Sequence, residues 1–249
     1  MKLFALMRRI FLLIAGLFLM SSGYAQTTAD IGLWGGGAGI QGDLEDISLD
    51  QMTFPALGAF VRYNFHYRTS LRLMFLTGKI SGSGTIQNNL WEYNKGVNDL
   101  TLQAEINYLR YALGNKKASF SAYVTAGLGL LYHKYVYDPE FMWLINPATN
   151  KGVEALVQRV LTPTLPVGMG FKFNVGKRMG LGVEYQLRKL VDDRLDNLDD
   201  PLAHFNMDGR EISYRDMIHN NDWLGFFGMH VTYRFYSGVK PCPAYDSKK

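Results

Sequence analysis

Apolar residues alternate with polar or small residues over most of the chain that follows residue 25. In residues 57–65 every second position is apolar, and the positions between them include Arg62 and Asn64. A period of two is typical of a β-strand whose two faces meet different surroundings. The same alternation occurs in residues 57–65, 71–75, 100–108, 122–132, 165–173, 181–187 and 227–235, and the glycine-rich residues 31–40 form a weaker first segment. The pattern therefore predicts eight strands.

The connections between these segments alternate between short and long. Residues 66–69, 114–118 and 175–178 are predicted tight turns, and residues 41–53, 79–97, 134–160 and 191–221 are predicted long loops. Short periplasmic turns and long outer loops are typical of a membrane barrel. The strands of a soluble β-sandwich also alternate apolar and polar residues, but nothing in a sandwich requires short loops at one end and long loops at the other. We therefore predict an all-β fold, an eight-stranded antiparallel transmembrane up-and-down β-barrel.

Aromatic residues lie where the predicted strands would meet the two surfaces of a bilayer. Rings at both interfaces are expected in such barrels. The rings near the short turns are Tyr63, Phe65, Tyr108, Phe171, Phe173, Tyr233 and Phe235, and those near the long loops are Tyr132, Trp143 and Trp223.

The amino terminus has the pattern of an export signal. Residues 1–9 are basic, residues 10–20 are apolar apart from Gly16, and small residues occupy positions 23 and 25. As a helix, residues 10–20 would rise only about 16 Å, against about 30 Å of hydrocarbon. We predict a signal peptide at residues 1–25, the barrel at 26–236 and a periplasmic tail at 237–249. The outer membrane is the expected location, which excludes nucleic acid as a partner.

Charged residues occupy the inward phase of the predicted strands. They are Arg62, Arg72, Glu105, Lys172, Glu184, Arg188, His230 and Arg234. An eight-stranded barrel is only wide enough for its side chains, and unpaired buried charges are costly. This favours a salt-bridged plug over an ion path.

The predicted loops carry acids and histidines but no recognisable site. The acids of residues 192–200 lack the alternating spacing of a calcium loop, so no metal or cofactor is expected. His133, His204, His219 and Ser213 have no spacing that sets a base beside a nucleophile and an orienting group. We predict that the protein is not an enzyme, and a lipid-modifying enzyme remains an alternative.

Basic residues gather at the end of the barrel that carries the predicted tight turns. They are Arg68, Lys116, Lys117, Lys177 and Arg178. Two interpretations stay open, namely contact with anionic lipids and steering of an acidic periplasmic partner.

Cys242 is the single cysteine of the chain and lies in the tail, between Pro241 and Pro243. With no second cysteine it cannot form an intramolecular disulfide. It is either an unpaired thiol or half of an intermolecular disulfide.

Several stretches resemble one family in the same order along the chain. They are Gly42-Asp43-Leu44, Pro55-Ala56-Leu57-Gly58, Leu76-Thr77-Gly78-Lys79, Pro166-Val167-Gly168-Met169-Gly170, Gly182-Val183-Glu184-Tyr185 and the tail Cys242-Pro243-Ala244-Tyr245. The chain resembles PorG, the outer-membrane barrel of the type IX (Por) secretion system of Bacteroidota. The resemblance implies a non-enzymatic component that joins the outer membrane to a periplasmic ring of PorK and PorN-like subunits. The alternative is a stand-alone OmpA-like structural barrel.

Overall fold

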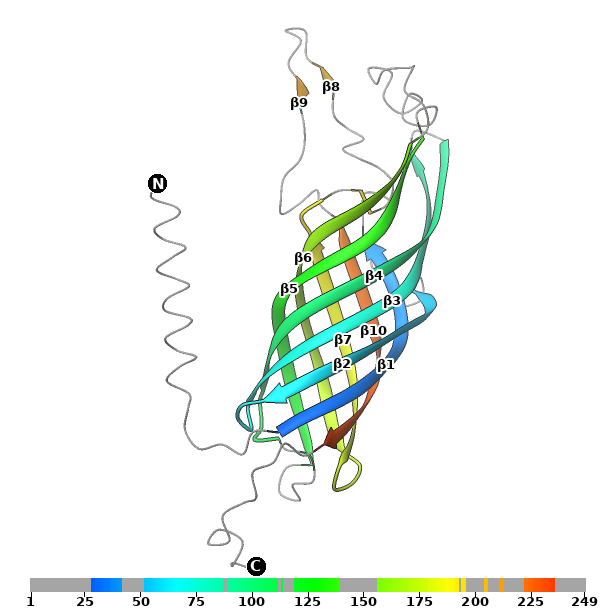
Figure 1. Ribbon diagram of the computed structural model, residues 1–249. Coiled ribbons are helices and arrows are strands. Elements are labelled where there is room, and N and C mark those ends of the chain that lie inside the picture. Colours follow the sequence, from blue (N-terminus) through cyan, green and yellow to red (C-terminus); the bar gives the residue numbers. More distant parts are fainter. Residues whose placement is uncertain are drawn as a thin grey trace, which may run out of the picture.

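Eight long strands close into one antiparallel barrel (Figure 1). The computed structural model describes residues 28–41, 52–86, 89–111, 113, 119–138, 156–192, 194–195, 204–205, 211–212 and 222–235. The barrel strands are β1 (Thr28–Gln41), β2 (Thr53–Asn64), β3 (Thr69–Ile86), β4 (Asn89–Asn107), β5 (Phe120–Tyr137), β6 (Leu156–Asn174), β7 (Met179–Leu190) and β10 (Trp223–Phe235). Two short strands, β8 (His204–Phe205) and β9 (Glu211–Ile212), pair with each other inside the connection from β7 to β10.

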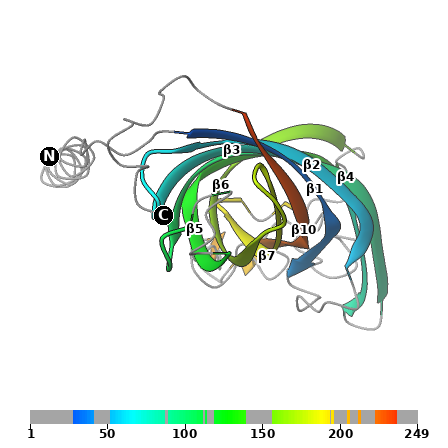
Figure 2. The ribbon, with the colours of Figure 1, turned by 90° about the horizontal axis from the view of Figure 1, so that it is seen from below.

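The barrel closes where its first strand meets its last. β1 pairs with β10 from Ala29–Phe235 to Gln41–Trp223, and it pairs with β2 on its other side. Figure 2, which views the molecule from below, shows the strands arranged around a closed ring. Closure gives every strand a neighbour on both sides, so no open sheet edge remains to be satisfied inside a bilayer.

The two faces of the wall have opposite chemistry. Outward-phase residues are apolar and exposed, as at Leu33 (69%), Leu128 (70%) and Met229 (66%). Inward-phase residues, such as Arg72 and Glu105, are fully buried. A soluble protein would place these two sets the other way round, because exposed apolar surface on this scale needs lipid to cover it. The predicted transmembrane barrel and the predicted strand phases are confirmed.

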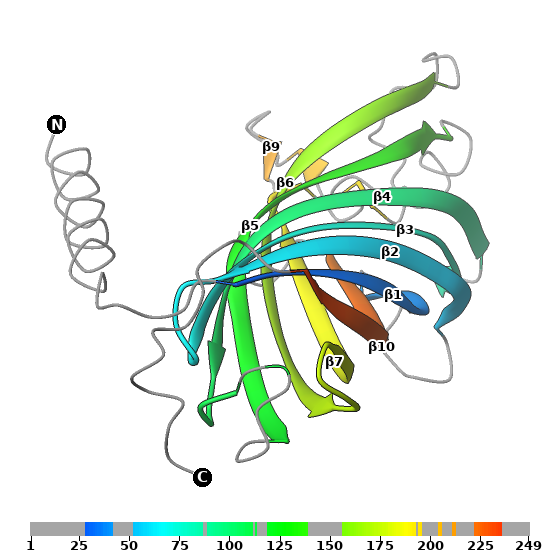
Figure 3. The ribbon, with the colours of Figure 1, turned by 60° about the horizontal axis from the view of Figure 1, so that its bottom comes forward.

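Three predicted connections differ from the structure. The segment 79–97 is mostly strand, because β3 and β4 stay paired as far as Ile86–Asn89. The two ends of the segment 134–160, residues 134–137 and 156–160, are also strand, because β5 and β6 stay paired as far as Tyr137–Leu156. The alternation fades in these extensions, because the outward face of β3 and β4 carries Ser81 and Asn94 there and that of β5 and β6 mixes Lys134 with Val136. Figure 3 shows the far ends of β5 and β6 diverging from those of β3 and β4.

The third difference is the predicted turn at residues 114–118. The connection between β4 and β5 is longer, since β4 ends at Asn107 and β5 begins at Phe120. The tight turns at 66–69 and 175–178 are confirmed by backbone bonds from His66 N to Thr69 O (3.2 Å) and from Val175 N to Met179 O (3.1 Å). Both turns lie at the end of the barrel where β1 starts and β10 finishes, which we call the turn end (Figure 1).

Candidate functional site

A network of ion pairs fills the half of the barrel interior nearest the turn end. At its centre the Glu105 carboxylate accepts from Arg62 Nη1 at 3.3 Å and from the ammonium of Lys172. Arg62 Nε also contacts Asp30 Oδ2 at 3.3 Å, and Arg72 Nη1 contacts Glu184 Oε2 at 2.8 Å. These side chains come from β1, β2, β3, β4, β6 and β7, so the network ties opposite walls together.

Neutral groups complete the network. The Tyr123 hydroxyl donates to Glu184 Oε2 at 2.6 Å and lies 3.2 Å from His230 Nε2. Gln103 Oε1 accepts from Arg72 Nη2 at 2.6 Å, and its amide nitrogen donates to Gln186 at 3.1 Å. Buried charges persist only when neighbours supply such bonds. The predicted salt-bridged plug is therefore present.

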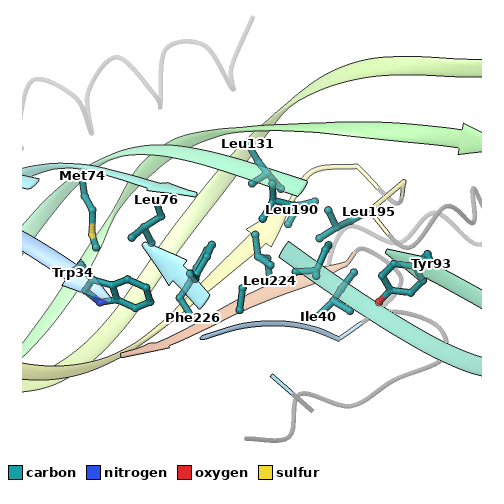
Figure 4. Close-up of a cluster of buried hydrophobic side chains, with 14 of the residues drawn as sticks. Trp34, Ile40, Met74, Leu76, Tyr93, Leu131, Leu190, Leu195, Leu224 and Phe226 are labelled. Carbon is teal, nitrogen blue, oxygen red and sulfur yellow. The ribbon is translucent and has the colours of Figure 1, made fainter. Parts of the chain in front are cut away.

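The other half of the interior is lined mainly by apolar side chains. Its buried cluster comprises Trp34, Ala38, Ile40, Ala56, Phe60, Met74, Leu76, Ile80, Tyr93, Val97, Leu131, Leu190, Leu195, Leu224 and Phe226 (Figure 4). Leu195 belongs to the connection after β7 and is fully buried, so it closes this half from the loop side. One further ion pair, Arg188 Nε to Asp99 Oδ2 at 2.8 Å, lies inside the wall, and its guanidinium is 5.3 Å from the ring of Phe226. Trp34, Leu131 and Phe226, which lie in this half, are 3% exposed or less.

The connection between β4 and β5 covers the interior at the turn end. Tyr111 and Leu113 are buried, and Arg234 donates to the Leu113 carbonyl at 2.5 Å while it pairs with Asp30 at 3.2 Å. Burial raises the pKa of the Tyr111 hydroxyl to about 12, so this ring stays neutral at physiological pH. The connection acts as a cap on the charged network.

The predicted partner-binding residues divide into two groups. Arg68, Lys177 and Arg178 are exposed and lie in the two tight turns, at the same end of the barrel. Lys116, Lys117 and Cys242 lie outside the described residues, as do the predicted signal peptide and tail. The described basic residues thus form a rim at the turn end, which we call the basic rim.

The candidate enzyme residues do not form a catalytic arrangement in the described part of the chain. His133 is buried in β5, and its Nε2 has no hydrogen-bond partner there. His204 lies in β8, whereas Ser213 and His219 fall outside the described residues. Among the described residues, no group of histidine, cysteine and acidic side chains has the geometry of a metal site. None of the helices in that part of the chain has the length and apolar character needed to span a membrane.

Sequence reasoning missed two acids that the network requires. Asp30 pairs with Arg62 and Arg234, and Asp99 pairs with Arg188. Asp30 immediately precedes the glycine-rich segment with weak alternation, and Asp99 precedes the predicted start of its strand by one residue. Extending each strand backward in phase would have placed both on the inner face.

The comparisons with known proteins concern the fold and the family. Among solved structures, the chain is similar to Ail of Yersinia pestis (TM-score 0.46, 14% identity, covering 84% of this chain and 99% of Ail). It is also similar to the Neisserial surface protein A (TM-score 0.45, 10% identity, covering 86% of this chain and 100% of that protein). A third similar structure is OprG of Pseudomonas aeruginosa (TM-score 0.42, 13% identity, covering 86% of this chain and 99% of OprG). No curated protein matches the sequence at a significant level. A family model described as a domain of unknown function, DUF6089, matches residues 8–246.

Proposed function

The chain belongs to the DUF6089 family, and we propose that it is a non-enzymatic outer-membrane component of a type IX secretion machine that anchors a periplasmic ring complex. The observation that carries the proposal is the filled interior. A barrel plugged by paired charges on one half and apolar packing on the other has no conduit for solutes. The protein would then act through its outer surface and the two ends of the barrel.

The turn end is the surface suited to a periplasmic partner. Short turns face the periplasm in outer-membrane barrels. Arg68, Lys177 and Arg178 are exposed there on turns that are fixed by backbone hydrogen bonds. A fixed basic surface raises the association rate with an acidic partner and orients it. Lys116, Lys117 and Cys242 belong to the same proposed surface.

The identity of the partner rests on the resemblance of the sequence to PorG. It implies PorK and PorN-like ring subunits, held by the basic rim and, where Cys242 is oxidised, by an intermolecular disulfide. The barrel anchors the complex in the outer membrane, because its eight strands close on one another into a ring that can span the bilayer.

Affinity purification of the tagged barrel from detergent-solubilised envelopes tests this function. We expect ring subunits to co-purify with the native protein. Their recovery should fall about tenfold or more with the triple variant Arg68→Glu, Lys177→Glu, Arg178→Glu, because attraction between the basic rim and an acidic partner becomes repulsion. The matched control is Lys79→Glu, an exposed β3 cation toward the opposite end of the barrel. Equal recovery with the triple variant, or no ring subunit at all, would favour a stand-alone structural barrel.

A further inference from the structure

Two cations face each other on the outer surface of the β5–β6 hairpin. Lys134 and Arg159 are directly paired across the two strands, and both side chains are exposed. Neither side chain has an ion pair or hydrogen bond with another residue of the described chain. Like charges directly opposite each other on a sheet repel. An anion placed between them would turn this repulsion into a two-point contact.

The rows next to the pair show where Lys134 and Arg159 lie relative to the membrane. The next rows toward the turn end are Tyr132–Leu161 and Leu130–Pro163, all on the outward face. Successive rows on one face are about 7 Å apart along a strand. The next row away from the turn end, Val136–Val157, is again apolar and exposed, so the two cations interrupt the outward apolar rows on the side away from the periplasm. An aromatic ring beneath them occupies the level of the headgroup boundary.

A groove begins on the same seam, one row below Tyr132. It has a volume of about 440 Å³ and is lined by Leu128, Leu130, Pro163, Leu165 and Leu100, among others. The short ring of Pro163 lies opposite Leu130 and between the longer Leu161 and Leu165, which leaves a notch in the outer surface. The lining is almost entirely apolar, as a site for a hydrocarbon chain requires.

The wall beneath the groove has an interrupted hydrogen-bond ladder. β5 and β6 pair at Ala126–Val167 and again at Gly129–Thr164, but not at the two positions between. Pro166 lies in this gap and has no N–H to donate. The interrupted ladder and the groove thus coincide on this seam.

From these features we propose that the β5–β6 seam binds one phosphorylated lipid of the outer leaflet. Its phosphate lies between Lys134 and Arg159, and one acyl chain occupies the groove at Pro163. Arginine contacts phosphate through two parallel donors, and the lysine adds a second positive charge. The Tyr132–Leu161 row lies between the two cations and the groove, and the lipid headgroup spans this row beside Tyr132. This site is independent of the basic rim, which lies at the opposite end of the barrel.

Native mass spectrometry of the detergent-purified full chain tests the proposal, with bisphosphorylated lipid A as the probe. We expect one lipid A per barrel, and about tenfold or more weaker binding of dephosphorylated lipid A or of native lipid A to the Lys134→Gln, Arg159→Gln variant. Lys79→Gln is the matched control, because Lys79 is an exposed cation of β3 that lies opposite a glycine rather than a second cation, and this variant should bind lipid A as the native chain does. Pro163→Phe fills the notch without changing charge and should weaken lipid A binding several-fold.

A competition experiment distinguishes a lipid from a free anion. Inorganic phosphate in large excess should not displace lipid A, and complete displacement would mean that the site takes a free anion. Unchanged affinity in the double variant, or an equal loss in Lys79→Gln, would overturn the proposal. Retained heat-modifiable mobility on electrophoresis shows that a variant is folded, and the double variant alters only exposed side chains.

Discussion

Arg72 Nη1 lies 2.8 Å from Glu184 Oε2, so one ion pair joins β3 to β7 across the barrel interior. These strands are not neighbours in the sheet, which runs β1-β10-β7-β6-β5-β4-β3-β2. The pair therefore links opposite walls that the backbone ladder connects only through intermediate strands.

Removing one member of this pair should destabilise the barrel strongly. Arg72→Met leaves Glu184 buried with only the Tyr123 hydroxyl as a donor, at a cost of about 3–5 kcal/mol. The double variant Arg72→Met, Glu184→Met removes both charges and should cost less than the sum of the two single changes. Denaturant unfolding in lipid vesicles measures all three. Strict additivity would show that the two residues do not interact.

The lipid-facing phase of β3 predicts a depth-dependent cost for a new charge. Leu73 is exposed in the middle of the apolar belt, whereas Thr69 lies in the same phase at the turn end. Leu73→Arg should cost about 2–4 kcal/mol, and Thr69→Arg about 0–1 kcal/mol. Folding yields and unfolding midpoints in vesicles compare the two, and equal losses would contradict the assigned depth of the strand.

Much of this architecture is accessible from the sequence because alternation records which face meets lipid. The outward phases of residues 57–65 and 100–108 agree with the exposed residues of β2 and β4. Alternation does not carry the register between strands. The inward position of Arg188 was predictable, but its pairing with Asp99 depends on which rows of β4 and β7 lie level across the interior.

Two other features escaped sequence reasoning for separate physical reasons. The tip of β3 is rich in serine and glycine, which favour turns, and it forms a strand because it pairs with β4 as far as Ile86–Asn89. The cap made by Tyr111 and Leu113 depends on the connection turning into the barrel mouth. That path is set by contacts such as the one from Arg234 to the Leu113 carbonyl, which lie far apart in sequence.

The filled interior predicts an absence of steady conductance. Purified barrel reconstituted into a planar lipid bilayer should pass no more current than the lipid alone, because Trp34, Phe226 and Leu224 pack together across one half and ion pairs occupy the other. Recordings at both polarities provide the measurement. Regular stepwise openings would show that the plug moves and that the barrel can conduct ions, which would favour a transport function.

Cys242 provides a chemical test of the periplasmic contact. In an oxidising compartment, a single exposed thiol near a partner tends to form a mixed disulfide. Non-reducing electrophoresis of whole cells should then show a higher-mass adduct that dithiothreitol removes and Cys242→Ser abolishes. Quantitative alkylation of the thiol in intact cells would exclude the disulfide and leave the contact to the basic rim.

Site-specific photo-crosslinking in living cells tests the anchoring role most directly. A photoreactive amino acid at position 177 places the probe in the exposed β6–β7 turn, and the same amino acid at position 79 places it toward the far end of β3. The account predicts a covalent adduct with a periplasmic ring subunit from position 177 and none from position 79. No adduct with such a subunit from position 177, in cells where the barrel is folded and the secretion machine is assembled, would contradict it.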